Sequence, residues 1–240
     1  MSRLLKRPHN FQRSAQARVG RWYELKNLAA DVAEVSIYDE IGAWGVTASE
    51  FCRDLQGVTA RTLELHINSP GGDVWDGLAI LNSLRQHPAT VNVTIDGLAA
   101  SAASFIAMAG DTVVMAPQSM FMIHEASGLV IGNSQDMADM AALLDKASAN
   151  IAQVYAQRAG GDVEDWRAAM RAETWYSDRE AVEAGLADAV LGEAEPQAKK
   201  PENKAPVPST DGQDEPTPAD PEAEFDLDEF QRLMKEAFSS

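Results

Sequence analysis

Two stretches of the chain share one order of features: an apolar strand, a tight turn of small residues and then a helix. The first runs from Leu63 to the glycine pair Gly71 and Gly72, and the second runs from Val91 to Ser101. Apolar runs of strand length that alternate with helical periodicity are typical of parallel strands joined by crossover helices. The repeat therefore predicts an α/β fold in which strand ends and helix starts meet at one side of a sheet.

The rest of the chain continues this alternation. We expect two short strands within residues 22–38 and further strands at 63–68, 90–95, 112–116 and 187–191, with one more apolar run that ends at residue 124. We expect helices at 47–55, 73–86, 99–110, 133–158, 162–170 and 178–185. The long helix carries a broad stripe of Met and Leu, which either covers the core or also contacts another subunit.

The two ends of the 240-residue chain differ from its middle. Residues 1–20 hold five bases and no acid, whereas residues 193–240 hold 13 acids, 5 bases and 7 of the 11 prolines. We expect a flexible basic segment at 1–20, one folded domain at 21–192 and a disordered acidic tail at 193–240. Apolar residues recur at helical spacing at the end of the tail, which predicts an amphipathic helix at 226–238 that docks in a partner's groove.

The charge and the cysteine content exclude several classes of protein. Subtracting the +5 and −8 of the two ends from the net charge of −17 leaves −14 on the middle, which argues against nucleic-acid binding. A single cysteine, Cys52, excludes an internal disulfide and a thiolate zinc site. No signal peptide and no apolar run of membrane-spanning length is present, so we expect a cytoplasmic protein without membrane association or cofactor.

Ser101 has the local setting of a catalytic nucleophile. It follows Gly97, Ala99 and Ala100, small residues that let a substrate backbone approach, and it precedes a helix whose N-terminus favours negative charge. A helix-capping serine is an equally good interpretation of the local sequence. Ser104, one turn later, is the competing nucleophile.

A serine nucleophile needs a base, and four histidines are available. His9 lies in the basic segment, His66 lies inside a strand, and His87 ends a helix. His124 stands at the end of an apolar strand, where an imidazole projects into the cleft at the ends of parallel strands. The sequence therefore predicts a serine hydrolase with Ser101 and His124 as its reacting pair.

The chain contains four motifs in this order: Ser69-Pro-Gly-Gly72, Gly97-Leu-Ala-Ala-Ser101, Met122-Ile-His124 and Glu180-Ala-Val-Glu-Ala-Gly-Leu-Ala-Asp188. Their sequences and their order resemble those of the Clp protease proteolytic subunit family, serine peptidases within the crotonase-like superfold. The match extends from about Val35 to Leu191. The resemblance implies a ClpP-like fold of repeated β-α units with a long handle helix.

The resemblance also implies the site. It assigns Ser101 as nucleophile, His124 as base, and the amides of Gly72 and Ala102 as the oxyanion hole. The family places an acid at the position of Glu173, where housekeeping members have Asp, so Glu173 is the expected third residue. Thr174 and Asp178 are the alternatives for that role.

By the same resemblance, the handle helix implies a homo-oligomeric ring, or two stacked rings, that takes protein or peptide substrates. The front of the chain and its acidic tail look more like phage-encoded members, so our first hypothesis is a head maturation protease that cuts scaffold or capsid protein in the host cytoplasm or procapsid. The alternatives are a cellular ATP-dependent subunit that works with an unfoldase and a weakly active capsid-assembly factor. An acyl-CoA hydratase of the same superfold is a further alternative, but the Ser-His pair argues against it because a hydratase needs no such pair.

Overall fold

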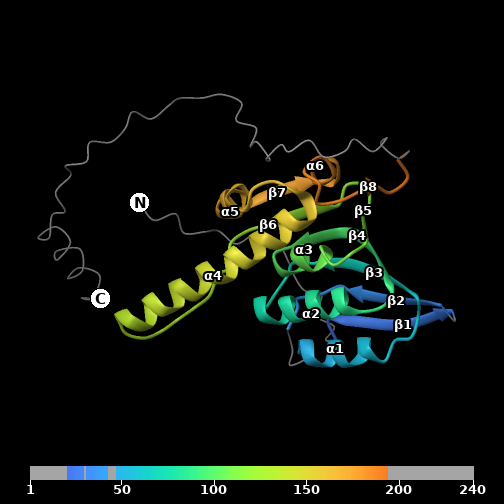
Figure 1. Ribbon diagram of the computed structural model, residues 1–240, viewed down its shortest axis with the longest axis horizontal. Coiled ribbons are helices and arrows are strands. Elements are labelled where there is room, and N and C mark those ends of the chain that lie inside the picture. Colours follow the sequence, from blue (N-terminus) through green and yellow to red (C-terminus); the bar gives the residue numbers. More distant parts are fainter. Residues whose placement is uncertain (1–20, 30, 43–46, 194–240) are drawn as a thin grey trace, which may run out of the picture. The chain divides into compact units, whose positions relative to one another are not determined.

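The computed structural model describes residues 21–29, 31–42 and 47–193 (Figure 1). The basic segment predicted at 1–20, the predicted tail after residue 193 and the helix predicted at 226–238 lie outside these residues. In chain order the described elements are β1 (Tyr23–Ala29), β2 (Val32–Ile37), α1 (Ala48–Gln56), β3 (Thr62–Ser69), α2 (Val74–Gln86), β4 (Thr90–Ala100), α3 (Ala102–Ala107), β5 (Thr112–Met115), β6 (Met120–Ile123), α4 (Ser134–Ala159), α5 (Val163–Arg171), β7 (Thr174–Ser177), α6 (Asp178–Glu183) and β8 (Ala189–Val190).

The strands form one mixed sheet in the order β1-β2-β3-β4-β5-β8, and β6 pairs with both β4 and β7. Strands β2, β3, β4, β5 and β8 run parallel to one another, and β6 runs parallel to β4. Strand β1 runs antiparallel to β2, and β7 runs antiparallel to β6. Helices α1, α2 and α3 lie beside the β1–β4 part of this sheet (Figure 1). The predicted α/β fold of repeated β-α units is therefore confirmed.

The core lies on one face of the sheet. Buried and half-buried residues alternate along β2 and β3, so every second side chain of these strands points into the core. In β3 the buried side chains include Leu63, Leu65 and Ile67, and in the neighbouring β4 they include Val91, Val93 and Ile95. Rigid packing of these parallel strands fixes the positions of their carboxyl ends, where the candidate site lies.

Strand β4 is longer than the sequence suggested. We expected a helix from residue 99, but Leu98, Ala99 and Ala100 pair with β6 and extend the strand to Ala100. Helix α3 begins only at Ala102 and ends at Ala107. The prediction of a helix from residue 99 was therefore wrong. The small side chains of this stretch favour a helix by propensity, but here the pairing with β6 decides the backbone conformation.

Helix α4 is docked over its C-terminal half only. Its buried residues are Ala147, Ser148, Ile151, Ala152, Val154 and Tyr155. The N-terminal half projects away from the sheet (Figure 1). Residues 128–133 lead outward beside this half to the start of the helix. Met137 and Leu143 are 44% and 43% exposed there, and Leu129 and Ile131 are 87% and 91% exposed. The predicted core-covering role therefore holds for half of the helix, and the inter-subunit contact stays a prediction.

Candidate active site

Ser101 lies at the junction of β4 and α3 in a strained backbone conformation. Its φ is 53° and its ψ is −122°, values that L-residues rarely adopt. It occupies the N-cap position of α3, yet its side chain makes no capping hydrogen bond. The ordinary capping role left open by the sequence is therefore not the role of this hydroxyl, and the sharp turn presents it away from the helix.

The hydroxyl of Ser101 instead contacts His124, the first residue after β6. The parallel pairing of β4 with β6 places Ala100 opposite Met122, and the amide of Ser101 donates to the carbonyl of Met122 at 3.0 Å. This register brings the two strand ends together, and Ser101 Oγ lies 2.7 Å from His124 Nε2. The predicted nucleophile and base are thus within direct hydrogen-bonding distance.

Burial favours the neutral form of this imidazole. It lowers the pKa of His124 from the usual 6.5, while the negative charge of Glu173 acts in the opposite direction. A neutral His124 can accept the proton of Ser101 near pH 7, and a nearby carboxylate stabilises the imidazolium that results. The two opposing effects are those that a general base in a serine hydrolase requires.

The competing candidates have other partners. Ser104 is fully buried, donates its hydroxyl hydrogen to the carbonyl of Ser101 and shares a hydrogen bond with the hydroxyl of Tyr155. His66 contacts Asp96 at 3.0 Å, and His87 contacts the carbonyl of Val58 at 3.2 Å. A buried serine tied to two oxygens cannot approach a substrate, which leaves Ser101 as the better candidate.

The glycine turn at Gly71 and Gly72 approaches the serine closely. A Cβ added to Gly71 would lie 2.6 Å from the Cβ of Ser101 and 2.8 Å from the amide nitrogen of Ala102, so only glycine allows this approach. Gly72 forms a bridge with Ile41 that uses the carbonyl of Gly71 and the amide of Asp73.

In this bridge the amide of Gly72 itself points away from Ile41. Gly72 lines the same cleft as Ser101. Ala102 is the first residue of α3, where an amide has no acceptor within the helix. Gly72 and Ala102 thus both lie beside Ser101, and their role as oxyanion-hole donors stays a proposal.

Glu173 lies in the turn between α5 and β7, a strand that the sequence analysis missed. Antiparallel pairing of β6 with β7 sets Ile123 opposite Thr174, so the adjoining residues His124 and Glu173 are neighbours. Glu173 is exposed, has a φ of 51°, and acts on the imidazole through its charge. No hydrogen bond joins this carboxylate to the ring in the described part of the chain, so Glu173 as the third catalytic residue stays a proposal.

The two alternatives for the third role are engaged elsewhere. The hydroxyl of Thr174 donates to the carbonyl of Ala169 at 2.8 Å. The carboxylate of Asp178 accepts the amides of Gln118 and Arg179, each at 2.8 Å, and these bonds hold its pKa below the usual value. Of the three candidates, Glu173 is the one whose charge affects the pKa of His124.

A small cleft of about 40 Å³ surrounds the serine and the histidine. Its apolar lining comes from three elements that are distant in the sequence: Val74 of α2, Phe105 of α3 and Ile151 of α4. The segment after His124 supplies the remaining wall, with Glu125, Ala126 and Ser127. The sequence analysis gave none of these lining residues a role in the site, because their common location depends on how three helices pack together.

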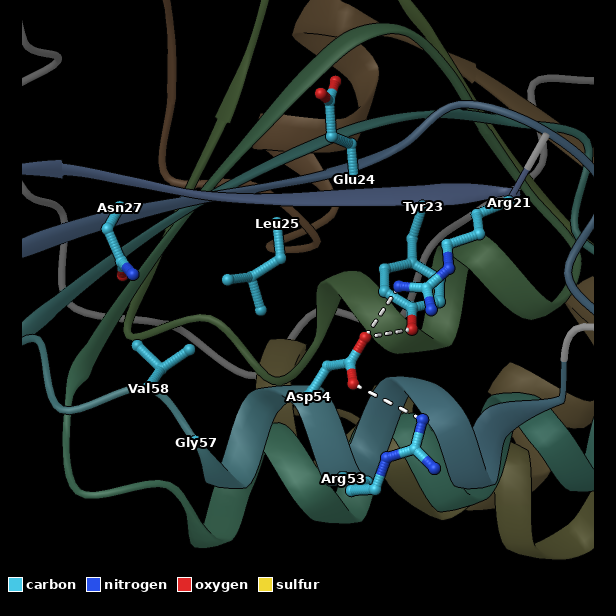
Figure 2. A pocket seen from close by; sticks show the side chains of 9 residues that line it. All are labelled: Arg21, Tyr23, Glu24, Leu25, Asn27, Arg53, Asp54, Gly57 and Val58. Atoms are coloured by element: carbon cyan, nitrogen blue, oxygen red, sulfur yellow. Dashed lines mark hydrogen bonds and ion pairs between the residues drawn. The ribbon is translucent and has the colours of Figure 1, made fainter. Parts of the chain in front are cut away.

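A larger cavity of about 500 Å³ lies between β1 and α1 (Figure 2). There Asp54 accepts hydrogen bonds from Arg21 and Tyr23, each at 2.8 Å, and Arg53 approaches it at 3.6 Å. Burial and the bond to Asp54 raise the pKa of Tyr23 to about 12, so its phenol stays protonated. The cavity contains neither a histidine nor an activated hydroxyl, so it has no counterpart of the Ser101 chemistry.

The described residues include no group of three or more His, Cys, Asp or Glu side chains that could hold a metal ion. Cys52 is half-buried and packs against the core. None of the helices in the described ranges is long and apolar enough to cross a bilayer.

Comparison with known proteins identifies the family to which this site belongs. The family model described as Clp protease matches residues 17–194, which include every residue of the candidate site. The chain belongs to the Clp protease family. It is therefore a serine-type peptidase with a ClpP-like fold.

Several curated relatives are similar to the chain over about half its length. The ATP-dependent Clp protease proteolytic subunit of Pleurastrum terricola is 35% identical over 131 residues, which are 54% of this chain and 67% of that protein. The protein of the same name from Streptococcus thermophilus is 32% identical over 135 residues, which are 55% of this chain and 69% of that protein. The counterpart from Streptococcus salivarius has the same identity and coverage.

Proposed function

We propose that this chain is the proteolytic subunit of a Clp-type endopeptidase, with Ser101 as nucleophile and His124 as general base. The observation that carries the proposal is the 2.7 Å contact between Ser101 Oγ and His124 Nε2. It lies in a cleft that Gly72 also lines. A serine, a base and backbone donors around one small cleft form the arrangement that acyl transfer requires.

In the first half of the reaction, His124 Nε2 takes the proton of Ser101 as its oxygen attacks the carbonyl carbon of the scissile peptide bond. The negative charge moves to the carbonyl oxygen, where the amides of Gly72 and Ala102 stabilise it. When the tetrahedral intermediate collapses, the imidazolium gives its proton to the leaving amine. The product is an ester between the substrate acyl group and Ser101.

Water then completes the cycle. His124 removes a proton from the water as it attacks the ester carbonyl, and returns that proton to the oxygen of Ser101 as the acid product leaves. Glu173 stabilises the imidazolium in both halves, which is the direction in which its charge acts on the pKa of His124. Because no hydrogen bond joins Glu173 to His124 in the described residues, this role is electrostatic.

The cleft lining favours an apolar side chain next to the scissile bond. Val74, Phe105 and Ile151 offer no hydrogen-bonding groups, so a polar substrate side chain would lose its water without compensation. We expect peptides with leucine, methionine or a similar residue at this position to be cleaved fastest.

The relatives support a cellular subunit over a phage head maturation protease. The similar proteins are named ATP-dependent Clp protease proteolytic subunits, which favours a peptidase that receives protein from an ATP-driven unfoldase. The hypothesis of head maturation depended on the front of the chain and on its tail, and the names of the relatives described above do not support it. The tail lies outside the described residues, so a partner for it stays a prediction.

We also propose that copies of this chain assemble into rings. The projecting half of α4 and the segment beside it expose Leu129, Ile131, Met137 and Leu143, an apolar surface that a second copy would cover. Light scattering of the wild type and of a Leu129→Asp/Ile131→Asp variant tests the assembly. We expect a large oligomer for the wild type and a smaller one for the variant. Equal masses would contradict the role of this apolar surface in assembly.

Peptide hydrolysis tests the catalytic proposal. Ser101→Ala should abolish cleavage of a fluorogenic peptide and of an unfolded protein, because loss of a nucleophile costs about a million-fold in kcat. Ser104→Ala is the matched control, since it removes a hydroxyl one turn away and should keep most of the activity. Full activity of the Ser101 variant, or loss in the Ser104 variant alone, would overturn the assignment.

A further inference from the structure

The segment that follows His124 is tied to two helices by one arginine. Arg167 of α5 donates to Glu125 Oε1 from Nε at 3.1 Å and from Nη2 at 2.7 Å. The same guanidinium reaches the carboxylate of Asp145 at 2.8 Å and the carbonyl of Asp145 at 3.2 Å. Its side chain is only 12% exposed, so these bonds form away from most of the solvent. Arg167 therefore connects α5, α4 and the strand end that carries the base.

Glu125 is the neighbour of His124 in sequence and lines the cleft. The next amide, that of Ala126, donates to Ser148 Oγ of α4 at 3.0 Å. The wall of the cleft is thus held at two adjacent points, one by Arg167 and one by Ser148. Movement of this wall would move the backbone of His124 with it.

We propose that Arg167 is a positioning residue for catalysis, which acts on the imidazole of His124 through Glu125. This inference rests on the proposed role of Ser101 and His124. Arg167 touches neither of them, so its effect depends on the carboxylate that it holds. A planar guanidinium can bind Glu125 and Asp145 at the same time, whereas the single ammonium of a lysine cannot reproduce that geometry.

Removing Arg167 should leave the half-exposed carboxylate of Glu125 without its partner. The carboxylate would then turn toward water or into the cleft, and the wall would lose one of its two attachments. Because displacement of a catalytic group by about 1 Å can cost about 100-fold in rate, we expect Arg167→Met to lower kcat between about 10-fold and 100-fold. KM should change little, because the apolar lining of the cleft stays in place.

A double-mutant cycle separates this role from a purely structural one. Glu125→Gln removes the charge that Arg167 holds, so it should cost less than Arg167→Met, and the double variant should behave like Glu125→Gln alone. Recovery of kcat in the double variant relative to Arg167→Met is the result that supports the proposal. Wild-type kcat in Arg167→Met, or losses that multiply in the double variant, would contradict it.

Asp145→Asn is the matched control. It removes the other carboxylate partner of Arg167 at a side chain that is 71% exposed and lies outside the cleft, so kcat should equal that of the wild type. Thermal unfolding tests whether each variant is folded. If Arg167→Met does not fold, the Glu125→Gln variant decides the question. A lower kcat with unchanged KM in that variant supports the proposal, and wild-type kcat opposes it. An inactive Ser101→Ala beside a fully active Arg167→Met would reject this inference alone, whereas an active Ser101→Ala would reject the site itself.

Discussion

Two cavities in the described part of the molecule differ widely in size and chemistry. The cavity between β1 and α1 is about 500 Å³, and the cleft beside Ser101 is about 40 Å³. In the larger one, Asp54 pairs with Arg21 and Arg53, so its charges stabilise each other. In the smaller one, a strained serine contacts a histidine whose pKa is lowered by burial.

The difference shows that chemistry, and not volume, locates the candidate site. Strain at Ser101 and a half-buried imidazole both cost stability, and structures keep such features where they have a function. The paired charges of the larger cavity carry no such cost. If this contrast is correct, substitutions in the cleft change catalysis, whereas substitutions in the cavity change only stability.

After the loss of Ser101 itself, the largest effect is expected at Glu173. Glu173→Gln removes the charge that stabilises the imidazolium, so we expect kcat to fall by about 10² to 10⁴ without unfolding the protein. Steady-state kinetics with a fluorogenic peptide measures the change. Asp178→Asn is the control, since its carboxylate caps backbone amides elsewhere. Near-normal activity of Glu173→Gln beside an inactive Asp178→Asn would move the third role to Asp178.

A smaller effect is expected at the apolar wall of the cleft. Val74→Thr keeps the shape of the side chain but adds a hydroxyl that must lose its water when a substrate binds. We expect kcat/KM for a peptide with leucine at the cleavage site to fall about tenfold, the equivalent of ~1.4 kcal/mol. An unchanged kcat/KM would show that Val74 does not contact the substrate.

The prediction for the pH profile of kcat/KM concerns the position of its midpoint and not the size of the activity. His124 must be neutral to accept a proton, and its pKa lies below 6.5, so the acid limb of kcat/KM should have its midpoint below pH 6.5. Glu173 raises this pKa, so Glu173→Gln should move the midpoint to still lower pH. A midpoint above 6.5 in the wild type, or an upward shift in the variant, is the opposite result.

The smallest catalytic effect is expected in the larger cavity. Tyr23→Phe removes the hydrogen bond to Asp54 and should lower the stability by about 1 kcal/mol, which thermal unfolding detects as a lower Tm. Its kcat should equal that of the wild type, because the cavity holds no reacting group. A loss of kcat at normal stability would break the contrast between the two cavities.

The sequence predicted most of the sheet because each strand of the repeat has a local signal. Leu63 to Asn68 and Thr90 to Ile95 read as strands from their apolar pattern alone. The extension of β4 to Ala100 was not predictable in this way, since it depends on pairing with β6. The two halves of α4 have similar apolar spacing, and only tertiary packing decides that Ile151 is buried and Leu143 is not.

The site was predictable to the extent that its residues occur in local motifs. Ser101, His124 and the glycine turn are close in sequence and were found together. Glu173 came only from the family resemblance, because the β6–β7 pairing that brings it to His124 joins distant segments. The ion pair of Arg167 with Glu125 spans 42 residues and has no sequence signal.

The central claim, that Ser101 is the nucleophile, is tested most directly by covalent labelling. A fluorophosphonate probe should add one group to the wild-type chain, and peptide mapping should locate it on Ser101. The Ser101→Ala variant should stay unlabelled, and Ser104→Ala should label like the wild type. Label on Ser104, or equal labelling of the wild type and Ser101→Ala, would contradict the account.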